Sequence, residues 1–279
     1  MVQGPFHNPH SPFPYSLCQP DRSKSCGACC GLYNLEDHSR ATLEPLLRRR
    51  TSLYPPLRED PRRFQEVCSP EAFPPNPKLL ETIYNCEFLG FLDREEKKVG
   101  CLLHPSVNDG MDLRNYCFYG EELCAGHFCP SYTCLTKVEQ KAVLNSVSDW
   151  YLYGLVITDI DLVKEFCRHA EMRLGDGLCE ERLEYPVVCR TLGDFFQLKG
   201  NWKFASSGKR LGKYYFSHSE YQIARIEYEK SWELKPSRFA KILLSLSSEF
   251  KDRGEVLEAE SIIDERINKF VEAYRQVSP

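Results

Sequence analysis

The sequence CGACC at residues 26–30 opens a compact, glycine-punctuated segment, CGACCGLYN, that ends at residue 34. Two cysteines separated by two residues can both reach one metal centre, and the intervening glycine permits the tight backbone that turns both sulfurs inward. The adjacent Cys29 and Cys30 point in different directions, so one of them can serve a second position or a second centre. This stretch therefore predicts a metal site rich in thiolates.

Two later groups of cysteines extend the pattern. Cys86 and Cys101 flank residues 93–100, which we interpret as a turn between two short extended runs that returns Cys101 beside Cys86. Cys124 and Cys129 are closely spaced around a glycine. Thiolate-rich sites select zinc or iron–sulfur clusters rather than magnesium or calcium. The predicted metal ligands are Cys26, Cys29, Cys30, Cys86, Cys101, Cys124 and Cys129.

Seven cysteines exceed the four ligands of one zinc ion or one iron–sulfur cluster. Either two centres are present, or one centre is accompanied by structural thiols. The spacing matches neither the bacterial ferredoxin run nor a zinc ribbon, so the metal stays open between zinc and an iron–sulfur cluster of the 4Fe–4S type. His104 and His127 are alternative ligands, although we expect hydrogen-bonded structural roles for them. The second choices among the cysteines are Cys18, Cys117 and Cys134, whereas Cys68 is expected to be a bystander.

CGACC, followed by Cys-Glu-Phe-Leu at residues 86–89 and Gly-Cys-Leu-Leu-His-Pro at residues 100–105, resembles the YkgJ-type cysteine-cluster family. That family is described as a zinc- or iron-chelating domain, and a similar domain occurs in flagellin lysine N-methylases. The resemblance covers residues 24–132. Family members continue with an RPxxCR segment, for which residues 114–117 and the group at 124–129 are the candidates here. The resemblance implies metal ligation by Cys26, Cys29, Cys30, Cys86 and Cys101.

Composition limits the class of protein. The chain has 279 residues, of which 42% are hydrophobic and 27% charged, as in ordinary soluble globular proteins. Its net charge of −4 gives no basic field, so nucleic acid and anionic membranes are not expected partners. The apolar run at 150–157 is too short for a membrane span. Residues 1–16 lack the pattern of a secretory signal, which predicts a cytoplasmic protein with reduced thiols.

The cysteines also suggest how the chain is divided. Eleven of the 14 cysteines fall within the first 134 residues, where turns and prolines are frequent. A loop-rich segment buries little apolar surface, and in the cytosol its usual staple is a metal. We predict an α+β to mainly α fold with an irregular arm at 1–25, a metal-stapled cysteine domain at 26–135 and a mainly α-helical domain at 136–279. The last three cysteines, Cys167, Cys179 and Cys189, are expected to be small buried hydrophobes.

Apolar spacing predicts the individual helices. The arginines at 48–50 are expected to form a solvated helix end, and the seven prolines within 54–78 exclude a long helix there. Lysines and aromatics at 199–219 are expected to form a hairpin or loop with a solvated basic edge, the alternative being contact with an acidic partner. The expected helices are 35–50, 62–67, a helix that starts near 136 and includes Tyr151, 159–174, 187–198, 237–251 and 255–277.

Three functions fit these observations. The first is a metal-binding cysteine-cluster protein of unknown physiological role. The second is an iron–sulfur-dependent redox or group-transfer enzyme, although the sequence contains no GxSxG, P-loop or HExxH motif and no recognisable S-adenosylmethionine motif. The third is a metal- or oxygen-sensing module that binds a protein partner. Whether the protein is an enzyme stays open at this point.

Overall fold

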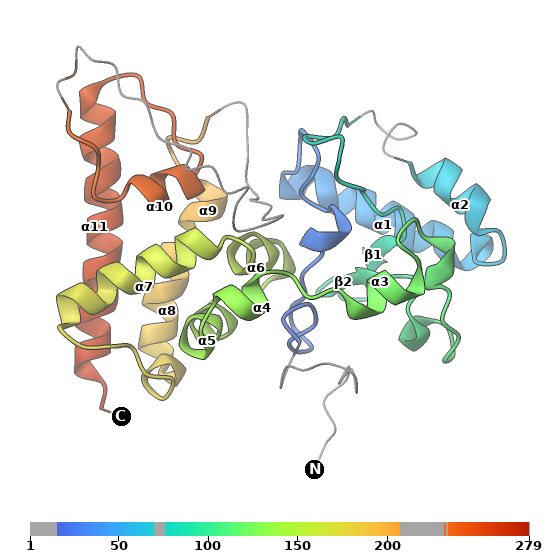
Figure 1. The fold of residues 1–279 in the computed structure, drawn as a ribbon, viewed down its shortest axis with the longest axis horizontal. Helices are drawn as coiled ribbons and strands as arrows, with labels where there is room; N and C mark the ends of the chain where they lie inside the picture. Colours follow the sequence, from blue (N-terminus) through green and yellow to red (C-terminus); the bar gives the residue numbers. More distant parts are fainter. Residues whose placement is uncertain (1–15, 70–75, 207–231, 233, 279) are drawn as a thin grey trace. The chain divides into compact units, whose positions relative to one another are not determined.

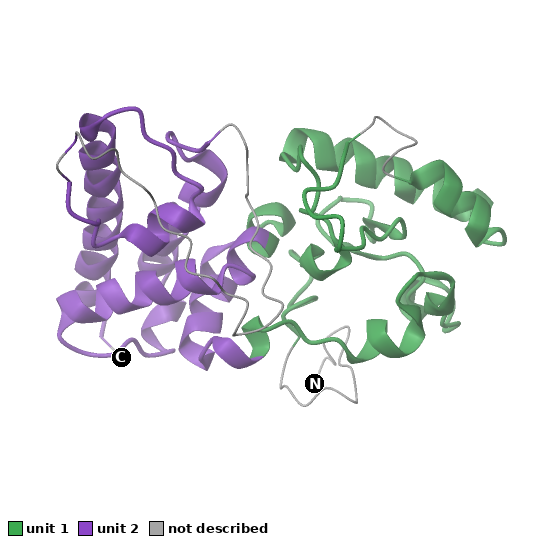
Figure 2. Ribbon diagram, turned by 45° about the horizontal axis from the view of Figure 1, so that its top comes forward, with its two compact units in different colours: residues 1–132, 149–154 green, residues 133–148, 155–279 purple. Residues whose placement is uncertain are grey.

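The computed structural model describes residues 16–69, 76–206, 232 and 234–278. Helices make up most of the regular structure in these residues, whose strands are limited to one short two-stranded sheet (Figure 1). The chain forms two compact units. Unit 1 comprises residues 1–132 and 149–154, and unit 2 comprises residues 133–148 and 155–279 (Figure 2).

Unit 1 is assembled from short elements and loops. It contains the helices α1 (Arg40–Leu57), α2 (Pro61–Cys68) and α3 (Gly120–Gly126), the strands β1 (Leu89–Phe91) and β2 (Val99–Cys101), and the 3₁₀ turns η1 (Ala28–Cys30), η2 (Pro105–Val107) and η3 (Arg114–Tyr116). The helix α4 (Ser131–Cys134) and the helix α6 (Trp150–Ile157) each contribute residues to both units.

Helix α1 continues past the predicted end at residue 50. Its buried face follows helical spacing through Leu43, Leu47 and Arg50 to Tyr54, so packing of the last turn outweighs the helix-breaking tendency of the prolines there. The prediction that the arginines at 48–50 form a solvated helix end is therefore wrong for Arg50, which is only 4% exposed.

The predicted turn after Cys86 is a β-hairpin. Strands β1 and β2 pair antiparallel, with Leu89 opposite Cys101. The Thr51 hydroxyl attaches helix α1 to this hairpin, because it accepts a 2.7 Å hydrogen bond from the backbone N–H of Phe91. The hairpin returns Cys101 toward the chain at Cys86, as the sequence predicted.

Unit 2 is a helical bundle with an aromatic core. Helix α11 packs against both α7 and α8, and α5 packs against α8. The centre of this core is Phe166, whose ring centroid lies 4.5 Å from that of Phe195 and 4.9 Å from that of Phe270. The predicted helix 159–174 is confirmed as α7. The elements of unit 2 are α5 (Lys137–Ser146), α7 (Ile160–Leu174), η4 (Arg182–Glu184), α8 (Pro186–Phe196), α9 (Leu198–Asn201), α10 (Ala240–Ser245) and α11 (Arg253–Gln276).

Two further helix predictions have the wrong extent. The helix expected from residue 136 through Tyr151 is divided between α5 and α6, because the Asp149 carboxylate accepts the backbone N–H of Tyr151 and Leu152 and starts a new helix. The helix expected at 237–251 is only α10, since the chain turns at Ser247, whose φ is +56°.

The prediction of a solvated basic edge at residues 199–219 is wrong at its first residue, Lys199. The Lys199 side chain is fully buried, and its Nζ lies 2.6 Å from Asp159 Oδ2. It belongs to α9 rather than to a solvated edge. Residues 207–219 of this stretch lie outside the described residues.

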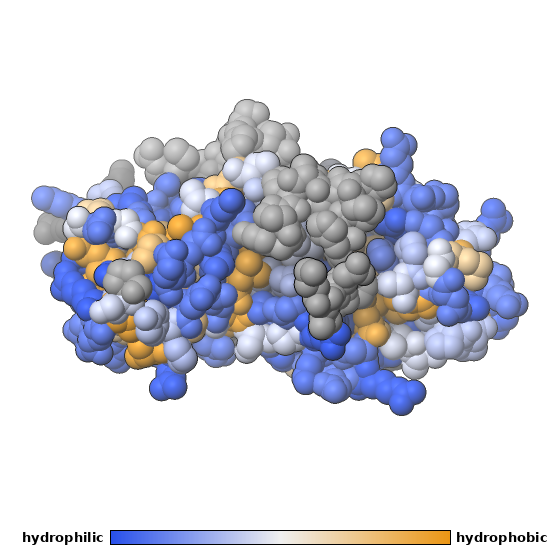
Figure 3. All heavy atoms as spheres, turned by 90° about the horizontal axis from the view of Figure 1, so that it is seen from below, coloured by the Kyte–Doolittle hydropathy of each residue, from blue (hydrophilic) through white to orange (hydrophobic). Residues whose placement is uncertain are grey.

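The surface view shows a mostly hydrophilic face with smaller hydrophobic areas (Figure 3). In the described part of the chain, no helix combines the length and apolar character needed to cross a bilayer. Among the residues of unit 1 that the structure describes, the exposed large hydrophobic side chains are Met111, Tyr116, Phe118 and Leu123.

Candidate metal centre

The CGACC segment forms the turn η1, and the glycine that follows fixes its position. Gly31 has φ +80°, and a Cβ atom there would lie 2.4 Å from the backbone oxygen of Tyr84. Only glycine therefore allows η1 to approach the segment around Cys86, whose N–H donates a 2.9 Å hydrogen bond to the Cys30 carbonyl. This contact brings the first and second cysteine groups of the sequence together.

One group of thiols consists of Cys18, Cys26, Cys29 and Cys129. The N–H of Cys26 donates a 2.8 Å hydrogen bond to the Cys18 carbonyl, and the Cys29 thiol donates to the Cys129 sulfur. All six pairs among these four thiols are close enough to interact electrostatically. We call this set group I.

A second set, group II, consists of Cys30, Cys86, Cys101, Cys117 and Cys124. The Cys86 thiol donates a hydrogen bond to Cys117, whose sulfur lies 3.4 Å from that of Cys124. Cys101 and Cys30 interact with one another and with Cys117. The seven predicted ligands thus divide between the two groups, and two second choices, Cys18 and Cys117, join them.

Five of these nine sulfurs lie beside backbone N–H groups that lower the pKa of the thiol. Each donor lies two or three residues after the cysteine, so a tight turn aims the amide at the sulfur. The acceptors and donors are Cys26 with Ala28, Cys86 with Phe88, Cys101 with Leu103, Cys117 with Tyr119 and Gly120, and Cys129 with Ser131 and Tyr132. Because a neutral thiol is a weak acceptor, these turns favour thiolate sulfur.

The hydrogen bonds divide the thiols into donors and acceptors. Donation from Cys29 lowers the pKa of Cys129, and donation from Cys86 lowers the pKa of Cys117. Burial raises the pKa of Cys101 to about 11. One sulfur in each group is therefore stabilised as a thiolate, whereas its neighbours hold their protons.

Two cations lie beside group II. Arg50 is buried and donates hydrogen bonds to the carbonyls of Cys86 and Cys68, and burial lowers its pKa. Burial raises the pKa of Cys101 and of Cys124, and Arg114, although it carries its own partner Asp112, opposes part of this rise.

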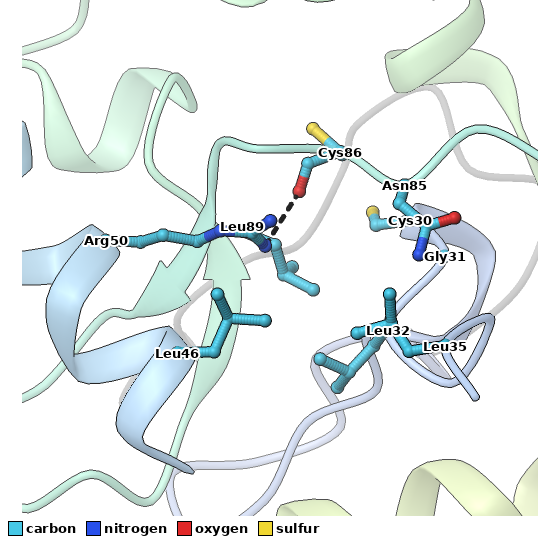
Figure 4. A pocket seen from close by; sticks show the side chains of 9 residues that line it. All are labelled: Cys30, Gly31, Leu32, Leu35, Leu46, Arg50, Asn85, Cys86 and Leu89. Carbon is cyan, nitrogen blue, oxygen red and sulfur yellow. Dashed lines mark hydrogen bonds between the residues drawn. The ribbon is translucent and has the colours of Figure 1, made fainter. Parts of the chain in front are cut away.

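A small pocket in unit 1 lies next to this arrangement. Cys30 and Cys86 line one side of it, and the leucines Leu32, Leu35 and Leu46 line the other (Figure 4). The carbonyl of Cys86 points toward Arg50 across the pocket. The two cysteines therefore meet an apolar wall and a buried cation.

The remaining candidates have other surroundings. The His104 ring accepts the N–H of Ser106 and caps η2, and His127 is exposed at the end of α3. Cys68 is buried, with Arg50 as its strongest charged neighbour. Cys134 ends α4 beside the Thr133 hydroxyl. Neither Cys68 nor Cys134 belongs to group I or group II.

Across residues 16–69, 76–206 and 234–278, no three Cys, His, Asp or Glu side chains are arranged as a ready metal-binding group. The sulfurs approach instead through hydrogen-bonded pairs such as Cys117 and Cys124. Binding a metal would require these side chains to rotate from their partners toward a shared centre. Comparison with known proteins gives no further guidance: the chain matches no family model, no curated protein and no solved structure.

Proposed function

We propose that this chain is a metal-binding cysteine-cluster protein that holds zinc or an iron–sulfur cluster through the thiolates of unit 1. The observation that carries the proposal is the set of backbone N–H groups aimed at five cysteine sulfurs. Hydrogen bonds of this kind orient metal-bound thiolates and tune their charge. The proposal includes the YkgJ-type resemblance of the cysteine pattern and a cytoplasmic location, where thiols stay reduced.

The crowding of sulfurs supports the same function. Nine cysteines in two groups would repel one another as thiolates, and as thiols they contribute only weak hydrogen bonds. A bound cation removes this conflict for the thiolates that ligate it, because it attracts each of them. Metal binding would also supply folding free energy to a unit that is built from short elements.

Arg50 supplies a further argument from charge. Its Nε has no hydrogen-bond partner among the described residues, and its two terminal nitrogens bond only to carbonyls. A buried cation without a carboxylate partner is costly. Four thiolates on one zinc ion or cluster carry excess negative charge, which Arg50 would offset beside Cys86.

The decisive test is the metal and acid-labile sulfide content of protein purified without oxygen, together with its visible spectrum. Iron with equivalent sulfide and a brown colour would identify an iron–sulfur cluster, and zinc without colour would identify a zinc protein. Cys189→Ser, a change in unit 2, serves as the matched control and should keep the metal. Folded protein without any metal would refute the proposal.

The exposed apolar side chains favour a sensing module as the second candidate function. Phe118 is 75% exposed and directly follows Cys117, and Leu123, 60% exposed, directly precedes Cys124. A change at these cysteines would therefore reach a surface suited to a protein partner. If hydrogen exchange at residues 111–123 is the same with and without the metal, this second function is excluded.

A further inference from the structure

We propose that group I is a metal centre of its own, with Cys18, Cys26, Cys29 and Cys129 as its four ligands, separate from a second centre in group II. This inference rests on the proposed function, and it adds the number of centres and the assignment of Cys18. The ligand would be a thiophilic metal, either a zinc ion or an iron–sulfur cluster, because both accept four cysteines.

The connections among the sulfurs carry the proposal. Within group I, the Cys26 N–H bonds to the Cys18 carbonyl and the Cys29 thiol bonds to Cys129. Tyr132 joins the two pairs, because its N–H bonds to the Cys129 carbonyl and its hydroxyl reaches the Cys18 sulfur. Cys30 lies between the two groups: among the described cysteines its strongest neighbour is Cys101 of group II, followed by Cys18 of group I. Four cysteines are the number that one zinc ion or one cluster takes, so group I would supply a full ligand set without any member of group II once its side chains turn toward a shared centre.

The turn η1 explains how neighbouring residues reach different centres. Cys29 bonds with Cys129 in group I, whereas Cys30 has Cys101 as its strongest cysteine neighbour in group II. The Cys30 carbonyl is fixed by the N–H of Cys86. Adjacent side chains on a 3₁₀ turn point in directions about 120° apart, so one short turn supplies both groups.

Cys18 is held in place by two tyrosines of the same unit. The Tyr132 hydroxyl accepts the N–H of Leu17 at 2.6 Å and reaches the Cys18 sulfur at 3.9 Å. The Tyr153 hydroxyl donates to the Leu17 carbonyl at 2.8 Å. Leu17 is 1% exposed. These contacts fix the backbone before Cys18.

The first experiment measures metal per chain in full-length protein purified without oxygen. We expect two equivalents of zinc, or iron and sulfide for two clusters, in the wild type. Cys18→Ser should lose one centre and keep the other, and Cys117→Ser should do the reverse. Cys68→Ser, a buried cysteine of unit 1 outside both groups, should keep both centres.

The second experiment needs no variant and therefore does not depend on their folding. The wild-type protein is alkylated under a phosphine reductant, which excludes disulfides, and the modified cysteines are mapped by mass spectrometry. We expect all four group I thiols to resist alkylation until a chelator removes the metal.

The outcomes separate the two proposals. One equivalent of metal, with group I alkylated and Cys86, Cys101 and Cys117 protected, would overturn the separate centre but leave the proposed function standing. Two equivalents that Cys18→Ser leaves intact would also overturn it. Absence of any metal would overturn both proposals.

Discussion

The two units of this chain reach a folded state by different means. Unit 2 buries an aromatic core between helices of up to 24 residues, with Phe166 and Phe270 fully buried. Unit 1 has strands of three residues and places cysteines such as Cys86 and Cys117 in its core. Burial of large apolar side chains offsets chain entropy in unit 2. Unit 1 has more of its chain in loops, where a metal would supply the missing stabilisation.

The two units also differ in how their buried cations are paired. In unit 2, Lys199 meets Asp159 at 2.6 Å and the Ser245 carbonyl at 2.5 Å, and the Ser245 hydroxyl bonds to the other oxygen of Asp159. In unit 1, Arg50 meets carbonyl groups but no carboxylate that the structure describes. Unit 2 therefore pairs its buried cation directly, whereas the buried Arg50 of unit 1 has no ion-pair partner among the described residues and interacts with Glu87 only electrostatically.

Metal removal should give the largest effect and should act on unit 1 alone. A structural zinc site is worth about 10–16 kcal/mol in small domains, more than the whole stability of many proteins. After chelation under reducing conditions, we expect amide hydrogen exchange to accelerate in α1 and the β1–β2 hairpin. Helices α7 and α11 should keep their protection. Equal protection of the α1 amides from hydrogen exchange before and after chelation would show that unit 1 does not need a bound metal to stay folded.

Breaking the buried ion pair should give the second-largest effect, this time in unit 2. Lys199→Met leaves the Asp159 carboxylate buried without its cation, which should cost about 3–5 kcal/mol. The measurement is denaturant unfolding followed by hydrogen exchange in α7, which Asp159 caps.

The exposed pair of Lys203 and Glu258 supplies the matched control. Both side chains are at least half exposed, so Lys203→Met should cost about 0–1 kcal/mol. In the double variant of Lys199→Met with Asp159→Asn, part of the stability should return, because no charge is left unpaired. A loss in Lys199→Met no larger than in Lys203→Met would contradict the account of unit 2.

Substitution of Gly31 should give a medium effect that links the fold of unit 1 to its thiols. Gly31→Ala forces a side chain into a left-handed conformation and against the Tyr84 carbonyl, at a cost of about 1–3 kcal/mol. Because η1 would shift from Cys86, metal content should fall as well. Gly126→Ala is the control, since nothing lies within 4 Å of a Cβ there. Unchanged stability and metal content in Gly31→Ala would contradict the role of this turn.

Local sequence patterns predicted much of the fold. Helix α7 and the hairpin at Cys101 follow from spacing and turns within a few residues, and both are present. The errors come from contacts with distant parts of the chain. Burial of Tyr54 allows helix α1 to continue through its prolines. Lys199 is buried because it pairs with Asp159, which is 40 residues away in the sequence. No local pattern contains these partners.

The candidate site shows the same limit. Cys117 carries a local signal, the sequence Cys-Phe-Tyr-Gly, in which Gly120 at φ +71° turns two amides toward the sulfur. Such Cys-x-x-Gly turns could have ranked it with the seven predicted ligands. Cys18 carries no comparable signal, because its position depends on Tyr132, 114 residues away. Spacing therefore found the grouped cysteines and could not find the isolated one.

Acidification should give the smallest effect and should act on unit 2. Burial, and then the neighbouring Arg168, lower the pKa of His169 below 6.5, while Glu165 opposes them. Its ring packs on Phe239 and bonds to the Arg238 carbonyl. Because the folded-state pKa lies below the unfolded one, this stabilisation is present above pH 6.5 and is lost as the pH falls through the folded value.

Comparison of the wild type with His169→Gln at pH 7 and pH 5 tests this point. The amide of glutamine can still donate to a carbonyl but does not titrate. We expect the wild type to lose about 1–3 °C more in melting temperature than the variant on acidification. Hydrogen exchange in α7 and α10 assigns the loss to unit 2, because thiol protonation in unit 1 would release metal over the same pH range. An equal loss in both proteins would mean that His169 contributes nothing to the acid sensitivity of the bundle.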